Sequence, residues 1–234
     1  MRLLLIETAT QVCSVAIADE GGIVAIRESD ESNAHSSQLA PFIDEMLRGQ
    51  GITPQEIDAV CVSSGPGSYT GLRIGVSTAK GFCYALGIPL VAVPTLQSMA
   101  ELYYRRHPEW DGMVCPMIDA RRMECYTAFF NRDGQLRDTA ADIIVDGIYS
   151  HYLDRGEVAF VGDGVAKCRD ILVVHPNAVF DETFRPSAEG MATAALRKLQ
   201  DGHTEDVAYF EPYYLKDFVA KKSVVHGLRD AVMN

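Results

Sequence analysis

The sequence lacks long hydrophobic runs, closely spaced cysteines and a surplus of basic residues. Its longest apolar stretches, such as residues 3–6, are far shorter than the ~20 residues that a membrane-spanning helix needs. No secretory signal peptide follows Met1, so we expect a cytoplasmic protein that does not enter a membrane. The six cysteines are at least ten residues apart, which excludes the Cys-x-x-Cys spacing of metal and redox motifs.

Recognisable catalytic patterns are also missing from the chain. No two of the six histidines stand three or four residues apart, so no helix presents a pair of imidazoles to a metal ion. Metal ligands assembled from distant positions remain an open alternative. A Gly-x-Ser-x-Gly element, which would expose a nucleophilic serine, is absent. We therefore predict no metal site and no catalytic residue in this chain.

The charge is strongly acidic, with 21 basic against 32 acidic residues and a formal net charge of −11. A protein that binds nucleic acid on its own usually has a basic face. If this chain acts on a nucleic acid, a partner protein must supply the positively charged surface that binds it. The alternative is an acidic, solvated surface that aids solubility.

The first half predicts three strands in an antiparallel meander, at residues 2–6, 12–18 and 23–27. A helix capped by Ser36 or Ser37 follows, then a strand at 57–62, a helix at 71–86, a strand at 89–93 and a helix from Thr95 to 106. The first of these helices has apolar side chains at helical spacing, namely Leu39, Phe42, Ile43, Met46 and Leu47.

The second half repeats this order, with strands at 113–119, 124–130 and from 136 onward. An offset of 112 aligns Glu7 with Asp119, and Cys13 with Cys125, which favours an internal duplication. A short helical segment at 147–153, a strand at 157–161 and a helix capped by Ser187 complete the prediction. Two βββαβα units with mixed sheets are typical of the two-lobed α/β fold of actin, Hsp70 and the sugar kinases (ASKHA). The expected lobes are residues 1–105, completed by about 216–234, and residues 106–215.

The most specific segment is the glycine-rich loop at residues 64–75. Gly65 and Gly67 flank Pro66 and give a rigid turn. Thr70 is expected to cap the next helix, so that the N–H groups of residues 71–73 form an anion site. No Gly-Lys-Ser/Thr follows, so this is not a Walker A loop. The alternative is a strand-to-helix turn with good capping.

The helix after this loop carries small residues every four positions. Gly75 and Gly81 each cost about 1 kcal/mol of helix propensity relative to alanine, so a packing reason is expected. Two reasons remain open, which are packing inside the lobe and contact with a partner helix.

Together with the loop, four further runs, at residues 4–10, 35–41, 118–126 and 211–215, make the whole chain resemble the bacterial TsaB proteins, also called YeaZ. The resemblance implies the actin-like fold. It also implies a non-catalytic dimerisation subunit for formation of N6-threonylcarbamoyladenosine (t6A) at tRNA position 37. The implied partners are a TsaD-like catalytic subunit, which this chain would bind and activate, and a TsaE-like ATPase. ATP and metal are expected in those partners, with no cofactor of this chain's own, and tRNA is expected to be reached only through the complex.

The resemblance has one departure, because the family usually has Asp-Thr where this chain has Glu7-Thr8. The longer acid weakens any prediction of independent ATP hydrolysis. An ATP-dependent enzyme of the actin and sugar-kinase superfamily, with Glu7 and Asp119 facing the cleft, remains the alternative. The candidate residues for an anion or nucleotide loop are Glu7, Thr8, Gly65, Gly67, Ser68, Thr70, Gly71, Arg73 and Asp119.

The partner surface is expected on the two helices of the first lobe, which would form a four-helix bundle with a TsaD-like subunit. The same surface would support a homodimer when the chain is alone. The expected interface residues are Leu39, Phe42, Ile43, Met46, Leu47, Ile74, Thr78, Gly81 and Ala85.

Overall fold

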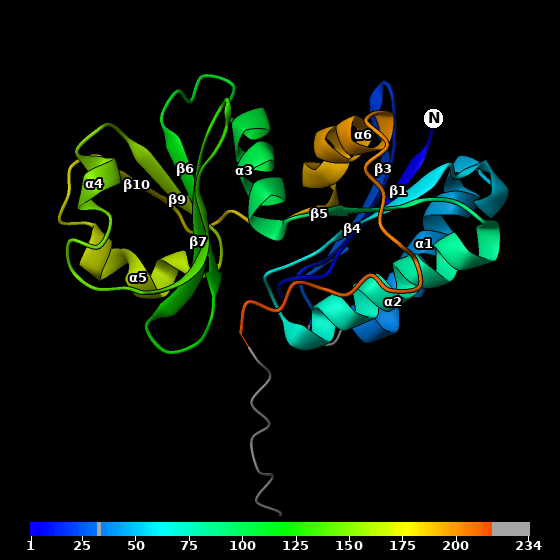
Figure 1. The fold of residues 1–234 in the computed structure, drawn as a ribbon, viewed down its shortest axis with the longest axis horizontal. Helices are drawn as coiled ribbons and strands as arrows, with labels where there is room; N and C mark the ends of the chain where they lie inside the picture. Colours follow the sequence, from blue (N-terminus) through cyan, green and yellow to red (C-terminus); the bar gives the residue numbers. More distant parts are fainter. Residues whose placement is uncertain (32–33, 217–234) are drawn as a thin grey trace, which may run out of the picture.

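The computed structural model describes residues 1–31 and 34–216, which form two five-stranded mixed sheets side by side (Figure 1). Each sheet joins an antiparallel meander to two parallel strands, and the strand orders, β3-β2-β1-β4-β5 and β10-β9-β6-β7-β8, are equivalent. This equivalence confirms the predicted two-lobed fold. The strands are β1 (Leu3–Glu7), β2 (Cys13–Asp19), β3 (Gly22–Ser29), β4 (Ala59–Ser63), β5 (Leu90–Val93), β6 (Met113–Asp119), β7 (Glu124–Asn131), β8 (Gly134–Ile143), β9 (Val158–Val161) and β10 (Ala178–Asp181).

The helices cover both faces of the two sheets (Figure 1). Sequence reasoning missed α5 and the strand β10, which follow the loop at residues 162–164. The helices are α1 (Ala34–Gln50), α2 (Tyr69–Leu86), α3 (Thr95–Arg106), α4 (Ser150–Leu153), α5 (Val165–Leu172) and α6 (Ala192–Gln200), with short 3-10 helices η1 (Pro54–Glu56) and η2 (Ala188–Met191). None of those within residues 1–31 and 34–216 combines the length and apolar character that crossing a bilayer requires.

The two lobes exchange one helix each. Leu96 and Met99 of α3, which follows the last strand of the first sheet, pack with Val114 and Ile118 of the second sheet. In return, η2 and α6 pack on the first sheet, where Met191 meets the apolar residues of β1. The packing therefore divides the chain differently from the expected boundaries at 105 and 215. The expected completion of the first lobe by residues from about 216 onward falls almost entirely outside the described residues.

The apolar stripe of α1 fills the core of its own lobe. Leu39, Ile43, Met46 and Leu47 are all buried in the core of this lobe, where α1 packs on β2, β3 and α2, and Phe42 is half-buried beside them. The prediction that this stripe forms a partner surface is therefore wrong for the four buried residues. Helix α1 also begins at Ala34, before the two serines expected to cap it.

Candidate functional site

A cleft of about 750 Å³ lies between the lobes. The first lobe contributes the β1–β2 turn and the start of α2, and the second contributes the β6–β7 turn and the loop after β9. Among the predicted anion-loop residues, the structure brings Gly67, Ser68, Thr70 and Asp119 to its lining. The others do not line the cleft, namely Glu7, Thr8, Gly65, Gly71 and Arg73.

Ser68, not Thr70, caps α2. Its Oγ accepts from the Gly71 N–H at 3.2 Å, and its carbonyl oxygen accepts from the Leu72 N–H at 2.9 Å. Two of the three N–H groups expected to hold an anion are therefore occupied within the chain. The loop at residues 64–68 behaves here as the well-capped turn that was the alternative.

The start of α2 lies directly against the β1–β2 turn. The Ser68 N–H donates to the Ala9 carbonyl oxygen at 2.6 Å, and Thr8 Oγ1 donates to the Gly71 carbonyl oxygen at 2.9 Å. A Cβ atom at Gly71 would overlap the Thr8 carbonyl oxygen, and one at Gly75 would overlap Thr8 Oγ1. Close packing inside the lobe therefore explains these two glycines.

Gly81 has no such explanation inside the lobe. It is exposed, and a Cβ atom there would meet nothing within 4 Å. Ala85 is exposed as well, Ile74 and Thr78 are half-buried, and the neighbouring Tyr84 is 86% exposed. The outer face of α2 is thus a small-residue surface beside an exposed aromatic ring.

Glu7 points into the first lobe. Its side chain is fully buried, and its Oε1 accepts from the Ala9 N–H at 2.6 Å and from Ser63 Oγ at 2.9 Å. Its Oε2 is buried without a hydrogen-bond partner among the described residues. Burial raises the pKa of this carboxyl to about 7. The expectation that Glu7 faces the cleft is wrong, and the residue instead fastens the turn to β4.

Replacing Glu7 with glutamine is expected to raise stability at high pH. Because the folded pKa is about 7 and the ordinary value is 4.5, the wild type loses stability as pH rises through this interval. The neutral amide does not titrate. We expect the free energy of unfolding of Glu7→Gln, relative to the wild type, to increase by about 2.5 kcal/mol between pH 5 and pH 8 in urea titrations. Glu45→Gln, at an exposed acid, is the control. An equal difference at both pH values would refute the assignment.

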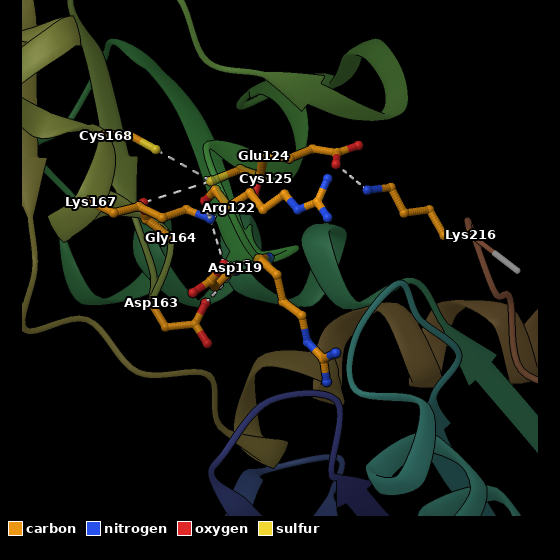
Figure 2. Close-up of polar contacts among 10 residues, drawn as sticks. Asp119, Arg122, Glu124, Cys125, Asp163, Gly164, Lys167, Cys168 and Lys216 are labelled. Carbon is orange, nitrogen blue, oxygen red and sulfur yellow. Dashed lines mark hydrogen bonds and ion pairs between the residues drawn. The ribbon is translucent and has the colours of Figure 1, made fainter. Parts of the chain in front are cut away.

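In the second lobe, two acidic residues at the cleft, Asp119 and Asp163, are linked by a hydrogen bond through the Asp119 backbone, and Asp119 is ion-paired with Lys167 (Figure 2). Asp119 Oδ1 accepts from Lys167 Nζ on α5 and from the Arg121 N–H at 2.6 Å, and the Asp119 N–H donates to Asp163 Oδ1 at 2.9 Å. Lys167 also donates to the carbonyl oxygens of Arg122 and Glu124, at 2.8 and 2.7 Å. The Asp119 carboxylate is therefore already neutralised by an internal cation.

Sequence reasoning found Asp119 from the internal repeat but missed Lys167. Lys167 belongs to α5, a helix that the sequence did not predict, so its contact with the β6–β7 turn is visible only in the structure. Asp163, in the loop between β9 and α5, was not among the candidate residues either. Within residues 1–31 and 34–216, no group of three or more His, Cys, Asp or Glu side chains is arranged to hold a metal ion.

The segment after α6 joins the lobes across the cleft. The Tyr213 N–H donates to the Ser64 carbonyl oxygen at 2.7 Å, and the Tyr214 ring lies 4.8 Å from the Tyr69 ring. Lys216 then forms an ion pair with Glu124 of the second lobe (Figure 2). The motif at residues 211–215 thus lies against the glycine-rich loop and the start of α2, and Lys216 directly after it contacts the second lobe.

Comparisons with known proteins match one family model, several relatives and solved structures. The family described as "TsaD: tRNA N6-adenosine threonylcarbamoyltransferase" matches residues 7–224. The Escherichia coli tRNA threonylcarbamoyladenosine biosynthesis protein TsaB is 32% identical, with 96% of this chain and 98% of that protein covered. Among solved structures, YeaZ from Pseudomonas aeruginosa is 25% identical with a TM-score of 0.80, covering 92% of this chain and 99% of that one.

A more distant structure shares only the fold. It is the activator of 2-hydroxyisocaproyl-CoA dehydratase from Clostridium difficile, solved with bound ADPNP. It is 12% identical with a TM-score of 0.50, covering 86% of this chain and 97% of that one.

Proposed function

Because the chain belongs to the TsaB family of tRNA threonylcarbamoyladenosine biosynthesis proteins, we propose that it is the non-catalytic dimerisation subunit of that pathway. In this role it binds and activates a TsaD-like catalytic subunit through α2. The main support for this interface is the outer face of α2. There Gly81 and Ala85 leave room for a closely packed helix, and the Tyr84 side chain is 86% exposed. Aromatic side chains are frequent anchors of protein interfaces.

Two features of the first lobe support a binding role over an independent catalytic one. The acid at the end of β1, Glu7, is fully buried and hydrogen-bonded to the β1–β2 turn. The start of α2 uses the N–H groups of Gly71 and Leu72 for its own cap. The Glu7 carboxyl and these N–H groups therefore stabilise the β1–β2 turn and the start of α2. In this proposal ATP and metal belong to the partner subunits, and the chain needs no cofactor of its own.

Reconstitution tests the proposal. Purified TsaD-like and TsaE-like subunits are mixed with tRNA, ATP, metal and the threonylcarbamoyl donor, with and without this chain, and t6A is measured after nuclease digestion. We expect modification to fall at least tenfold without the chain, and no modification by the chain alone. Full activity of the partners without the chain would overturn the proposal.

The acidic chain is expected to meet tRNA only within the complex. Its 32 acidic residues outnumber its 21 basic ones, so the chain as a whole repels phosphates, and a gel-shift titration of the isolated chain at low salt should show no micromolar binding. We propose that the chain acts in the cytoplasm, together with the other subunits. A homodimer through α2 is the expected state when the partner is absent.

The inter-lobe cleft favours a second candidate, an ATP-dependent enzyme of the same superfamily. Its volume of about 750 Å³ lies in the range of small-molecule sites. Phosphate release from ATP by the chain alone, above the level of an Asp119→Asn variant, would support this candidate. No release would favour the dimerisation role.

A further inference from the structure

The segment of residues 205–214, here called the flanking segment, follows α6 and lies beside α2 (Figure 1). At its start, the Glu205 N–H donates to the carbonyl oxygen of Leu90, just after the end of α2, at 2.8 Å. Near its end, the Tyr213 N–H donates to the carbonyl oxygen of Ser64, just before the start of α2, at 2.7 Å. The flanking segment therefore runs along α2 in the opposite direction.

Lys80 of α2 holds the middle of the flanking segment. Its Nζ donates to the carbonyl oxygens of Ala208 and Phe210, at 3.1 and 2.9 Å. The turn before it is closed by Asp206 Oδ1, which accepts from the N–H groups of Ala208 and Tyr209 at 2.8 and 3.1 Å. Phe210 packs against the core of the first lobe, whereas the Tyr209 side chain is 84% exposed. The backbone is thus fixed on both sides of a ring that faces solvent.

The exposed aromatic side chains gather on these two elements. Within residues 1–31 and 34–216, the exposed rings are Tyr84 of α2 and Tyr209 and Tyr213 of the flanking segment. Tyr84 follows Lys80 by one helical turn, so it lies on the side of α2 that holds Tyr209. Aromatic residues are enriched in the cores of protein interfaces and are frequent anchors there. Their confinement to α2 and its neighbour marks one continuous surface for a partner protein.

The outer face of α2 is too small to hold a partner by itself. A stable interface buries about 800 Å² on each partner, of which one fully buried aromatic side chain supplies about 150–250 Å². Besides Tyr84 and Arg73, the exposed positions of α2 carry only small side chains, namely Thr70, Ser77, Gly81 and Ala85. Helix α1 also contacts α2, but none of its large apolar side chains is exposed. The flanking segment, with two exposed rings, is therefore the element that extends the surface.

We propose that the TsaD-like subunit contacts the flanking segment as well as α2, an inference that rests on the dimerisation role proposed above. Tyr209 is the anchor of this extension, and Lys80 is the positioning residue that holds it. The matching surface of the partner is a closely packed helix facing Gly81, beside an apolar pocket that receives the Tyr209 ring. The exposed Glu211 belongs to the polar rim, where a basic side chain of the partner suits it.

Isothermal titration of the full chain with the purified TsaD-like subunit tests the anchor. Tyr209→Ala is expected to weaken the complex at least tenfold, because it removes a ring that the partner buries. The Tm of the isolated chain should not change, since this ring is 84% exposed in the free chain. The control Val174→Ala shortens a side chain of the second lobe that is 73% exposed, and it should leave the Kd unchanged.

A double-mutant cycle tests the positioning role of Lys80. Lys80→Met keeps the aliphatic stem but removes the ammonium that donates to the carbonyl oxygens of the flanking segment. We expect it to weaken the complex at least threefold in the wild-type background and to have no effect in the Tyr209→Ala background. A general loss of stability would not produce this dependence on Tyr209. Equal effects of Lys80→Met in both backgrounds would refute its positioning role.

The outcomes separate this inference from the proposed function. A wild-type chain that does not bind the TsaD-like subunit would overturn both. A wild-type chain that binds, together with unchanged affinity of Tyr209→Ala, would overturn only the extension to the flanking segment. Analytical ultracentrifugation of the chain alone distinguishes the other occupant, a second copy. If Tyr209→Ala weakened self-association but not the complex with the partner, the segment would serve a homodimer and the proposal would be wrong.

Discussion

Replacing Gly81 with leucine is expected to leave the chain folded and to weaken its association with the TsaD-like subunit by about 10- to 100-fold. Gly81 is exposed and has open space around it, so the isolated chain can accept a larger side chain. At a close contact between helices the same side chain would force the partner away, and overpacking of this kind costs about 1–3 kcal/mol. Isothermal titration or surface plasmon resonance with the purified partner gives the Kd.

A second variant and a control separate this effect from general damage. Tyr84→Ala removes an exposed ring and should weaken the complex by about 2 kcal/mol, the size of an interface anchor, with no loss of thermal stability. Ala166→Leu enlarges an exposed residue of α5 in the second lobe and should leave the Kd unchanged. Wild-type affinity of both α2 variants would place the interface elsewhere on the chain.

The sequence predicted α2 well but not the roles of its small residues. Helical periodicity and the glycine-rich loop located the helix within two residues. Periodicity alone cannot show what covers each side, because the cause lies far away in the chain. Gly75 is small because Thr8 lies on it, while Gly81 faces outward. Packing inside the lobe, one of the two explanations left open by the sequence, therefore applies to Gly75 but not to Gly81.

The same limit explains the other errors. The apolar stripe of α1 was predicted to meet a partner, but its own lobe buries most of it, because α1 packs on β2, β3 and α2. The choice of Ser68 over Thr70 as the cap depends on the hydrogen bond from Ser68 to Ala9. The exchange of α3 and α6 between the lobes could not be predicted either, since a connecting helix has the same pattern whichever sheet it covers.

The cleft was only partly predictable for a related reason. The internal repeat identified Asp119 as the counterpart of Glu7, yet the structure gives the two acids different surroundings. Glu7 is fully buried, whereas Asp119 lines the cleft and is paired with Lys167. An alignment of the two halves shows equivalent backbone positions. It does not show which side chain a neighbouring helix will neutralise.

Two alanine substitutions in α2 are expected to change stability in opposite directions. In Gly71→Ala the new Cβ overlaps the carbonyl oxygen of Thr8, so the β1–β2 turn or the helix must shift. We expect a loss of about 2–3 kcal/mol, which lowers Tm by roughly 5–10 °C for a chain of this length. In Gly81→Ala the new Cβ meets open space, and the gain in helix propensity should add up to about 1 kcal/mol. Calorimetry of the isolated chain measures both.

This pair separates the contact with Thr8 from helix propensity, because both changes add the same methyl group to the same helix. If Gly71→Ala were as stable as the wild type, the close approach of Thr8 to α2 would be wrong. The turn at residues 8–9 would then not depend on the glycines that follow the loop. If the contact is as the structure shows, Thr8→Ser, which keeps the hydroxyl that donates to Gly71, should preserve more stability than Thr8→Val, which loses it. The β1–β2 turn lines the cleft and also supports α2, so its displacement in Gly71→Ala should weaken partner binding as well as the fold.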